Sequence, residues 1–162
     1  MNLFRTYIKQ SITLLLLTFA VLSFGQSNDQ VFMIGEKEKA YERLVGQCTD
    51  ILLGVCDNSM ETAYDKWSTM LYDIEKYAEK SEFDIKGIKI WINVFWNPDG
   101  TVKNIIYYPK PNSKNMNFDD LSLFFSSFIA EYQLDLSNST CFSHYGSASF
   151  PTFAKGIPAQ EK

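Results

Sequence analysis

Side chains that could carry acid–base or nucleophilic chemistry are few in this sequence. His144 is the single histidine of the 162 residues, so a site built on several histidines is excluded. A serine or cysteine nucleophile would need this one imidazole as its base, and no glycine-framed serine motif or glycine-rich phosphate loop is present. His144 also falls on the apolar side of a predicted strand, which favours a core histidine. We therefore predict no catalytic residue, no cofactor and no metal.

Three cysteines offer a second kind of chemistry, a disulfide bond. Cys48 and Cys56 are eight positions apart, and on a single helix that spacing puts their Cα atoms about 12 Å apart. A disulfide tolerates roughly 7 Å. Any bridge would then join Cys141 to Cys48 or to Cys56 and leave one thiol over. Three small apolar side chains packed as free thiols are the alternative.

The amino terminus has the order of residues that a secretory signal requires. Arg5 and Lys9 precede an apolar run, Ser11 to Phe24, which ends among small residues. The run is shorter than the roughly 20 residues of a permanent membrane helix. We predict cleavage near Gln26 and export to the periplasm or the medium, where disulfides can form. An uncleaved leader that anchors the protein is the alternative.

The remaining chain has the composition of one globular domain. Hydrophobic residues make up 46% and aromatic residues 15%, and the net charge is -4, which is unlike a disordered chain. An acidic balance also excludes a sequence-independent nucleic-acid binder. We predict the following division: signal peptide 1–25, linker 26–35, a single domain 36–153, and a flexible tail 154–162.

Hydrophobic periodicity indicates the elements of this domain. A repeat of three and four residues predicts two amphipathic helices, and a repeat of two predicts strands on both sides of Asn97-Pro98-Asp99-Gly100. Asn58 can cap the second helix, and Asn117 can cap a third, with Asp119 and Asp120 in its first turn. The predicted elements are helices 36–55, 58–81 and 118–132 and strands 88–96, 101–108 and 141–150.

This order predicts an α+β fold, in which two N-terminal helices precede a β-β-α-β unit and a three-stranded antiparallel sheet packs on the helices. The stretch from about residue 86 to 153 resembles the TonB C-terminal domain family. The resemblance rests on a strand into Pro98-Asp99-Gly100-Thr101-Val102, a returning strand, a helix, and a last strand closing on Phe150-Pro151-Thr152-Phe153. It implies a small antiparallel sheet in the periplasm that binds a short peptide of an outer-membrane protein by strand pairing. The chain lacks the proline-rich span of the family's energy-transducing members.

The hairpin register predicts two unlike faces of the sheet. If Asn97 lies opposite Thr101, the even-numbered residues of the first strand face the core. The odd-numbered face carries aromatic rings, and in the last strand it carries a tyrosine among serines. We therefore predict an exposed aromatic patch for protein contact, made of Trp91, Phe95, Tyr107 and Tyr145. The alternative is that one of the first two helices covers this face, which would make Trp91 a core residue.

Together these patterns predict an exported, non-catalytic protein-binding module of the bacterial cell envelope. It would bind an envelope or outer-membrane protein by strand addition at a sheet edge or through the aromatic patch. A homodimer through the aromatic face is a further possibility. The other class of function is a small secreted ligand-binding or enzymatic domain with a pocket between the helices and a curved sheet. The inward polar side chains available to such a pocket are Asn104, His144 and Tyr108.

Overall fold

A computed structural model describes residues 30–152 of the chain. The predicted signal peptide 1–25, residues 26–29 of the predicted linker, residue 153 at the end of the predicted domain and the tail 154–162 lie outside these residues. The fold is mixed α+β. Its elements in chain order are β1 (Val31–Met33), α2 (Glu38–Gln47), β2 (Asp50–Ile51), α3 (Leu52–Val55), α4 (Met60–Lys80), β3 (Lys89–Trp96), β4 (Val102–Pro109), α5 (Phe118–Glu131) and β5 (Phe142–Ser149).

One five-stranded sheet organises the domain, with the strand order β1-β4-β3-β5-β2. Its centre is the predicted antiparallel unit, because β3 pairs antiparallel with both β4 and β5. Two short strands that the sequence did not predict extend the sheet. β1 pairs parallel with β4, and β2 pairs parallel with β5. The prediction of three strands is therefore correct for the centre of the sheet and incomplete at its edges.

The second and third predicted helices correspond to α4 and α5. The Asn117 side chain accepts a hydrogen bond from the Asp119 N–H at 3.0 Å, which confirms the predicted cap of α5. The cap of α4 is Ser59, whose Oγ accepts from the Thr62 N–H at 3.2 Å. Asn58 was the predicted cap, but it has a left-handed backbone with φ of 59° and lies one residue before the cap, Ser59. The Asn58 side chain is therefore not the cap.

The first predicted helix, 36–55, is interrupted in the structure. It ends at Gln47, and the chain then extends through β2 before the four-residue α3. Pairing of Asp50 and Ile51 with β5 holds this part of the chain extended. Leu52 and Cys56 are buried in the core, as residues on one face of a continuous helix would be, so the periodicity of the sequence does not reveal the break. The prediction of a single helix over 36–55 is therefore wrong.

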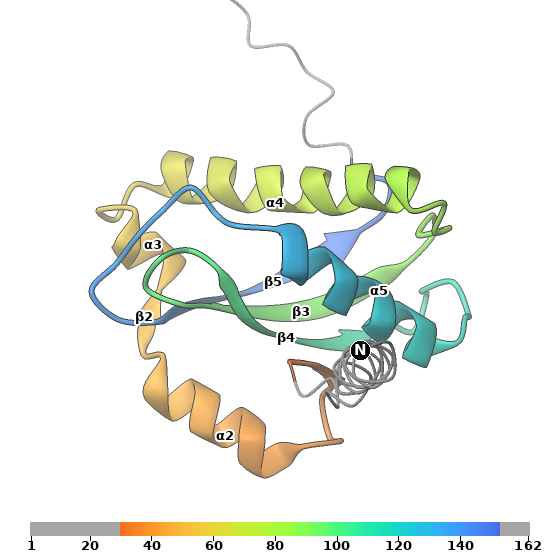
Figure 1. The fold of residues 1–162 in the computed structure, drawn as a ribbon, viewed down its shortest axis with the longest axis horizontal. Coiled ribbons are helices and arrows are strands. Elements are labelled where there is room, and N and C mark those ends of the chain that lie inside the picture. Colours follow the sequence, from red (N-terminus) through yellow and green to blue (C-terminus); the bar gives the residue numbers. More distant parts are fainter. Residues whose placement is uncertain (1–29, 153–162) are drawn as a thin grey trace, which may run out of the picture.

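Helices cover both faces of the sheet (Figure 1). α4 and α5 lie on one face and enclose the main core, which includes Ile90, Ile92 and Val94 of β3. α2 lies on the opposite face and encloses a smaller core. That smaller core consists of Phe32, Leu44, Cys48, Phe95 and Ile106.

The hairpin contains a bulge that overturns the predicted register. The turn itself is as predicted, since the Asn97 N–H donates to the Thr101 carbonyl at 2.8 Å and Trp96 pairs with Val102. The register then shifts, because Phe95 pairs with Asn104 and leaves Lys103 as the extra residue. Beyond the bulge every side chain of β4 changes face relative to β3. Tyr107 therefore lies on the face of α4 and α5.

Candidate functional site

β5 presents an open strand edge. Along one side it pairs with β3 over its full length, from Phe142 to Ser149. On the other side β2 pairs only with Phe142 and Ser143. Among residues 30–152, no other strand pairs with β5, so the edge from His144 to Ser149 is open.

Alternate residues of β5 direct their backbone N–H and C=O groups toward this open edge. The Phe150 N–H donates to the Ile88 carbonyl at 2.9 Å, so even-numbered residues of this strand are hydrogen-bonded to β3. In an antiparallel pair the intervening residues direct their N–H and C=O groups to the other side. The outward residues are Tyr145, Ser147 and Ser149. An extended segment laid against β5 would meet the backbone groups of these three residues.

The edge lacks the features by which proteins usually prevent unwanted strand pairing. Natural edges carry charged side chains, prolines or bulges. The sequence of β5 is Phe-Ser-His-Tyr-Gly-Ser-Ala-Ser, without charged residues or proline. Its pairing with β3 is continuous and has no register shift. The open part of β5 is therefore regular, uncharged and competent to pair.

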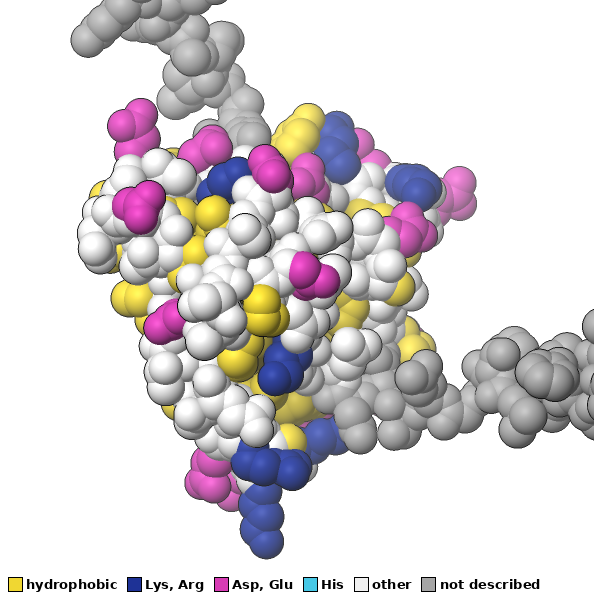
Figure 2. All heavy atoms as spheres, turned by 60° about the vertical axis from the view of Figure 1, so that its left-hand side comes forward, with side chains coloured by type: hydrophobic (Ala, Val, Ile, Leu, Met, Phe, Trp, Pro, Cys, Tyr) yellow, Lys and Arg dark blue, Asp and Glu magenta, His cyan; other side chains and the backbone are white. Residues whose placement is uncertain are grey.

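An apolar groove of about 440 Å³ lies at the β2 end of this edge, where His144 and Tyr145 of the open part line it, and α4 forms one of its walls. Met60 and Tyr64 of α4 contribute much of its exposed wall, being 70% and 61% exposed. Figure 2 turns the left-hand side of Figure 1 forward and shows hydrophobic side chains at the surface, scattered among uncharged and charged atoms. The residues lining the groove are Ile51, Leu53, Met60, Ala63, Tyr64, Trp67, Ser143, His144 and Tyr145.

Close packing of Trp67 on Gly146 positions α4 over β5. A Cβ atom on residue 146 would lie 2.9 Å from Cζ2 of Trp67, so only glycine permits this approach. The Trp67 ring also contacts the His144 ring, with 4.6 Å between the ring centroids. The contact at Trp67 thus fixes α4 on β5. The turns of α4 before Trp67 form one wall of the groove.

His144 lines the groove as an uncharged side chain. Burial lowers the pKa of its imidazole below the usual value, so the neutral form prevails at neutral pH. Its ring packs against Trp67. Asn104 and Tyr108, the other two predicted pocket residues, lie on the opposite face because of the bulge, so the predicted group of three polar side chains does not converge.

The opposite face of the sheet carries an aromatic cluster next to α2. Trp91 and Tyr145 are exposed as predicted, at 41% and 58%, and their rings lie 6.4 Å apart and 17° from parallel. The Lys110 ammonium lies 4.1 Å from the centroid of the Trp91 ring and donates to the Ser147 Oγ. Tyr108, which pairs with Trp91 across the strands, is also exposed.

Two members of the predicted aromatic patch are buried, contrary to prediction. Phe95 is covered by α2, whose Tyr41 ring meets it edge-on at 6.4 Å. Tyr107 lies on the other face, and its hydroxyl donates to the Phe118 carbonyl at 2.8 Å. Burial raises the pKa of Tyr107 to about 12. The exposed cluster therefore consists of Trp91, Tyr108 and Tyr145, and the alternative of a covering helix holds for Phe95.

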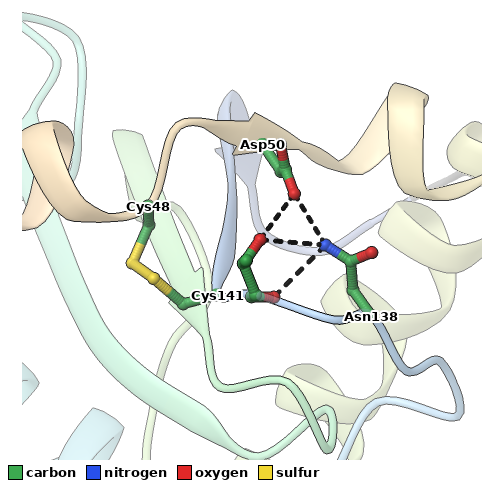
Figure 3. The surroundings of a disulfide bond; sticks show 5 residues. Cys48, Asp50, Asn138 and Cys141 are labelled. Carbon is green, nitrogen blue, oxygen red and sulfur yellow. Dashed lines mark hydrogen bonds between the residues drawn. A yellow bond between two sulfur atoms is a disulfide. The ribbon is translucent and has the colours of Figure 1, made fainter.

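A disulfide corner closes the first two positions of the β5 edge (Figure 3). Cys48 is bonded to Cys141, one of the two pairings that the sequence left open, and Cys56 is a buried free thiol. The Asp50 carboxylate accepts hydrogen bonds from Thr140 Oγ1 at 2.6 Å and from Asn138 Nδ2 at 2.9 Å. These bonds lower the pKa of Asp50. β2 is thus held on β5 at Phe142 and Ser143.

Two other functional features, a metal-binding cluster and a membrane-spanning helix, are absent from residues 30–152. Within residues 30–152, no group of three or more His, Cys, Asp or Glu side chains is arranged to hold a metal ion. None of the helices described is long and apolar enough to cross a membrane. No family model, curated protein or solved structure matches the chain. The resemblance to the TonB C-terminal domain family stays a prediction.

Proposed function

We propose that this protein is an exported, non-catalytic binding module of the bacterial cell envelope. It holds an extended segment of an envelope or outer-membrane protein as an additional strand on β5. The observation that carries this proposal is the edge from His144 to Ser149, which is unpaired within the described residues, uncharged and bordered by an apolar groove.

Strand addition would use both the backbone and the groove. Hydrogen bonds with the outward N–H and C=O groups of Tyr145, Ser147 and Ser149 would supply affinity for any extended backbone. Alternate side chains of the added strand would point to the α4 side, where Met60 and Tyr64 present apolar surface. The backbone therefore provides binding and the groove provides selection.

Two further features support the proposed location in the cell envelope and the proposed mode of binding. The Cys48–Cys141 disulfide is suited to an oxidising compartment such as the periplasm, in keeping with the predicted signal peptide. The predicted family resemblance independently implies peptide binding by strand pairing. A homodimer through the same edge would be a variant of this contact, whereas a homodimer through the aromatic cluster would use a face of the sheet instead.

A small apolar ligand is the alternative function that the groove itself favours. Its volume of about 440 Å³ falls in the range of ligand pockets, and its wall is mainly apolar. The His144 side chain is available to orient such a ligand on the α4 side, whereas the side chain of Ser143 lies on the α2 face with Phe95. Binding of a small ligand would not use the outward N–H groups of β5, and this difference separates the two functions by experiment.

Replacing Ser147 with proline tests strand addition. Ser147→Pro removes an outward N–H without touching the ladder to β3, a position at which edge strands tolerate proline. Ser147→Ala is the matched control, because it keeps the N–H and loses the same side-chain hydroxyl. Capture of partners from an envelope extract, with circular dichroism to check the fold, should fail for Ser147→Pro and persist for Ser147→Ala. Equal capture by both variants would exclude strand addition at this edge.

A further inference from the structure

We propose that the segment bound by β5 carries apolar side chains on one face and an acidic side chain on the other. This inference rests on the proposed function, because it describes the two faces that an added strand would present. In a strand, successive side chains point to opposite faces of the sheet. The two surfaces beside the β5 edge differ in polarity and charge, so they would select different residues at alternate positions.

The face toward α4 selects apolar side chains. Among the described residues, no charged side chain lines the groove, whose wall is formed largely by Met60, Tyr64 and Trp67. A charged side chain of the partner would lose its hydration there without gaining a partner of opposite charge. The polar ring in the wall, that of His144, is neutral at pH 7 because burial lowers its pKa. Aliphatic and aromatic residues are therefore favoured opposite His144 and Gly146.

The other face presents positive charge. The Lys110 ammonium is held on the Ser147 Oγ and over the Trp91 ring. Lys89 belongs to the same end of this face, since it pairs with Ser149 and its carbonyl accepts from the Lys110 N–H at 2.9 Å. Neither lysine forms an ion pair with another residue in the described part of the chain. Both charges thus remain available to a partner.

Successive side chains of an added strand would meet the apolar α4 side and the positively charged side in turn, so one segment would carry both residue types. A partner residue directly opposite Ser147 lies on the same face as Ser147, with Cβ atoms about 4.5–5.5 Å apart. An Asp or Glu there would lie beside the Lys110 ammonium that Ser147 holds. The partner residues opposite His144 and Gly146 would point to the other face, toward the groove and Trp67. The matching pattern is therefore apolar residues opposite His144 and Gly146 with an acidic residue opposite Ser147.

Selection from a phage-displayed library of linear 12-residue peptides on the purified, immobilised protein tests this inference. Enriched peptides should carry two aliphatic or aromatic residues two positions apart, with Asp or Glu directly next to one of them. Lys110→Glu should reduce their recovery at least tenfold and shift enrichment toward Lys and Arg at the acidic position. Lys103→Glu, on β4 at the bulge, is the control and should leave the pattern unchanged.

The variants separate failure of this inference from failure of the proposed function. If peptides are enriched on the wild type and lost with Ser147→Pro, but show no acidic preference or ignore Lys110→Glu, the inference is overturned and strand addition stands. If the same peptides bind Ser147→Pro as well as the wild type, or if none is enriched above the Ser147→Pro background, both proposals are overturned.

Discussion

Trp67 of α4 lies so close to Gly146 of β5 that a Cβ atom on residue 146 would come within 2.9 Å of the indole ring. This contact sets the height of α4 above the sheet and hence the shape of the groove at the β5 edge. A glycine inside a strand usually weakens it, so its presence in β5 indicates a close approach. The groove therefore depends on a single missing side chain.

Gly146→Ala should disturb this contact. The added methyl group cannot fit without moving Trp67, and overpacking of this kind costs about 1–3 kcal/mol in the free energy of unfolding. Denaturant unfolding followed by circular dichroism measures the change. Gly54→Ala in α3 is the control, since nothing lies within 4 Å of its added Cβ. A Gly146→Ala variant as stable as the wild type would show that α4 is not fixed by this contact.

Loss of the disulfide should loosen the corner that holds β2 on β5. Cys48 and Cys141 are 93 positions apart in the sequence, and removal of a native bridge of this kind typically costs about 2–5 kcal/mol. Cys48→Ser should show this loss in denaturant unfolding under oxidising conditions. Cys56→Ser keeps the bridge, so added reductant should still lower its stability but should leave Cys48→Ser unaffected. The same response to reductant in both variants would argue against the Cys48–Cys141 bond.

The stability of the domain should fall as the pH drops below about 6.5. Burial lowers the pKa of His144 from its ordinary value of 6.5, so the unfolded chain binds the proton more readily than the folded one. The contribution of His144 to the free energy of unfolding is therefore fully present above pH 6.5. It decreases as the pH falls toward the lower pKa of the folded state, by at most about 1.4 kcal/mol per pH unit. His144→Gln should flatten the profile between pH 6.5 and 5. A wild-type profile that is already flat in this window would contradict the burial of His144.

Tryptophan quenching should find one accessible indole among the three. Trp91 is 41% exposed, whereas Trp67 and Trp96 are buried. Acrylamide should quench part of the wild-type emission strongly, and Trp91→Phe should remove that accessible fraction. Trp96→Phe is the comparison and should leave it in place. If Trp91→Phe does not reduce the accessible fraction, the aromatic cluster is covered and cannot act as a contact surface.

The central elements could be predicted from the sequence because their signals are local. The strands β3 and β4 are rich in β-branched and aromatic residues on both sides of a proline–aspartate–glycine turn, and α5 begins at a capping asparagine. The strands β1 and β2 have three and two residues, too few to show a period. Their extended form comes from pairing with β4 and β5, which are distant in the sequence. No sequence pattern within them reports this pairing.

The candidate site was predictable only in part. Alternation placed Trp91 and Tyr145 on an exposed face, but the bulge at Lys103 exchanged Tyr107 for Tyr108 there. Nothing in the residues around Lys103 marks a bulge, so the register error could not be avoided. Gly146 did carry a usable signal, since a glycine within a predicted strand indicates close packing. The open edge itself depends on where β2 stops pairing, which only the tertiary structure reveals.

Amide hydrogen exchange at β5 is the most direct test of strand addition. Residue-level exchange would be followed by NMR, in the free protein and with a peptide selected on it. In the free protein the outward amides of Tyr145, Ser147 and Ser149 should exchange rapidly, while those of Gly146 and Ala148, bonded to β3, should be protected. The peptide should slow the three outward amides at least tenfold and leave the protected ones unchanged. Outward amides that remain fast in the complex would contradict strand addition as the mode of binding.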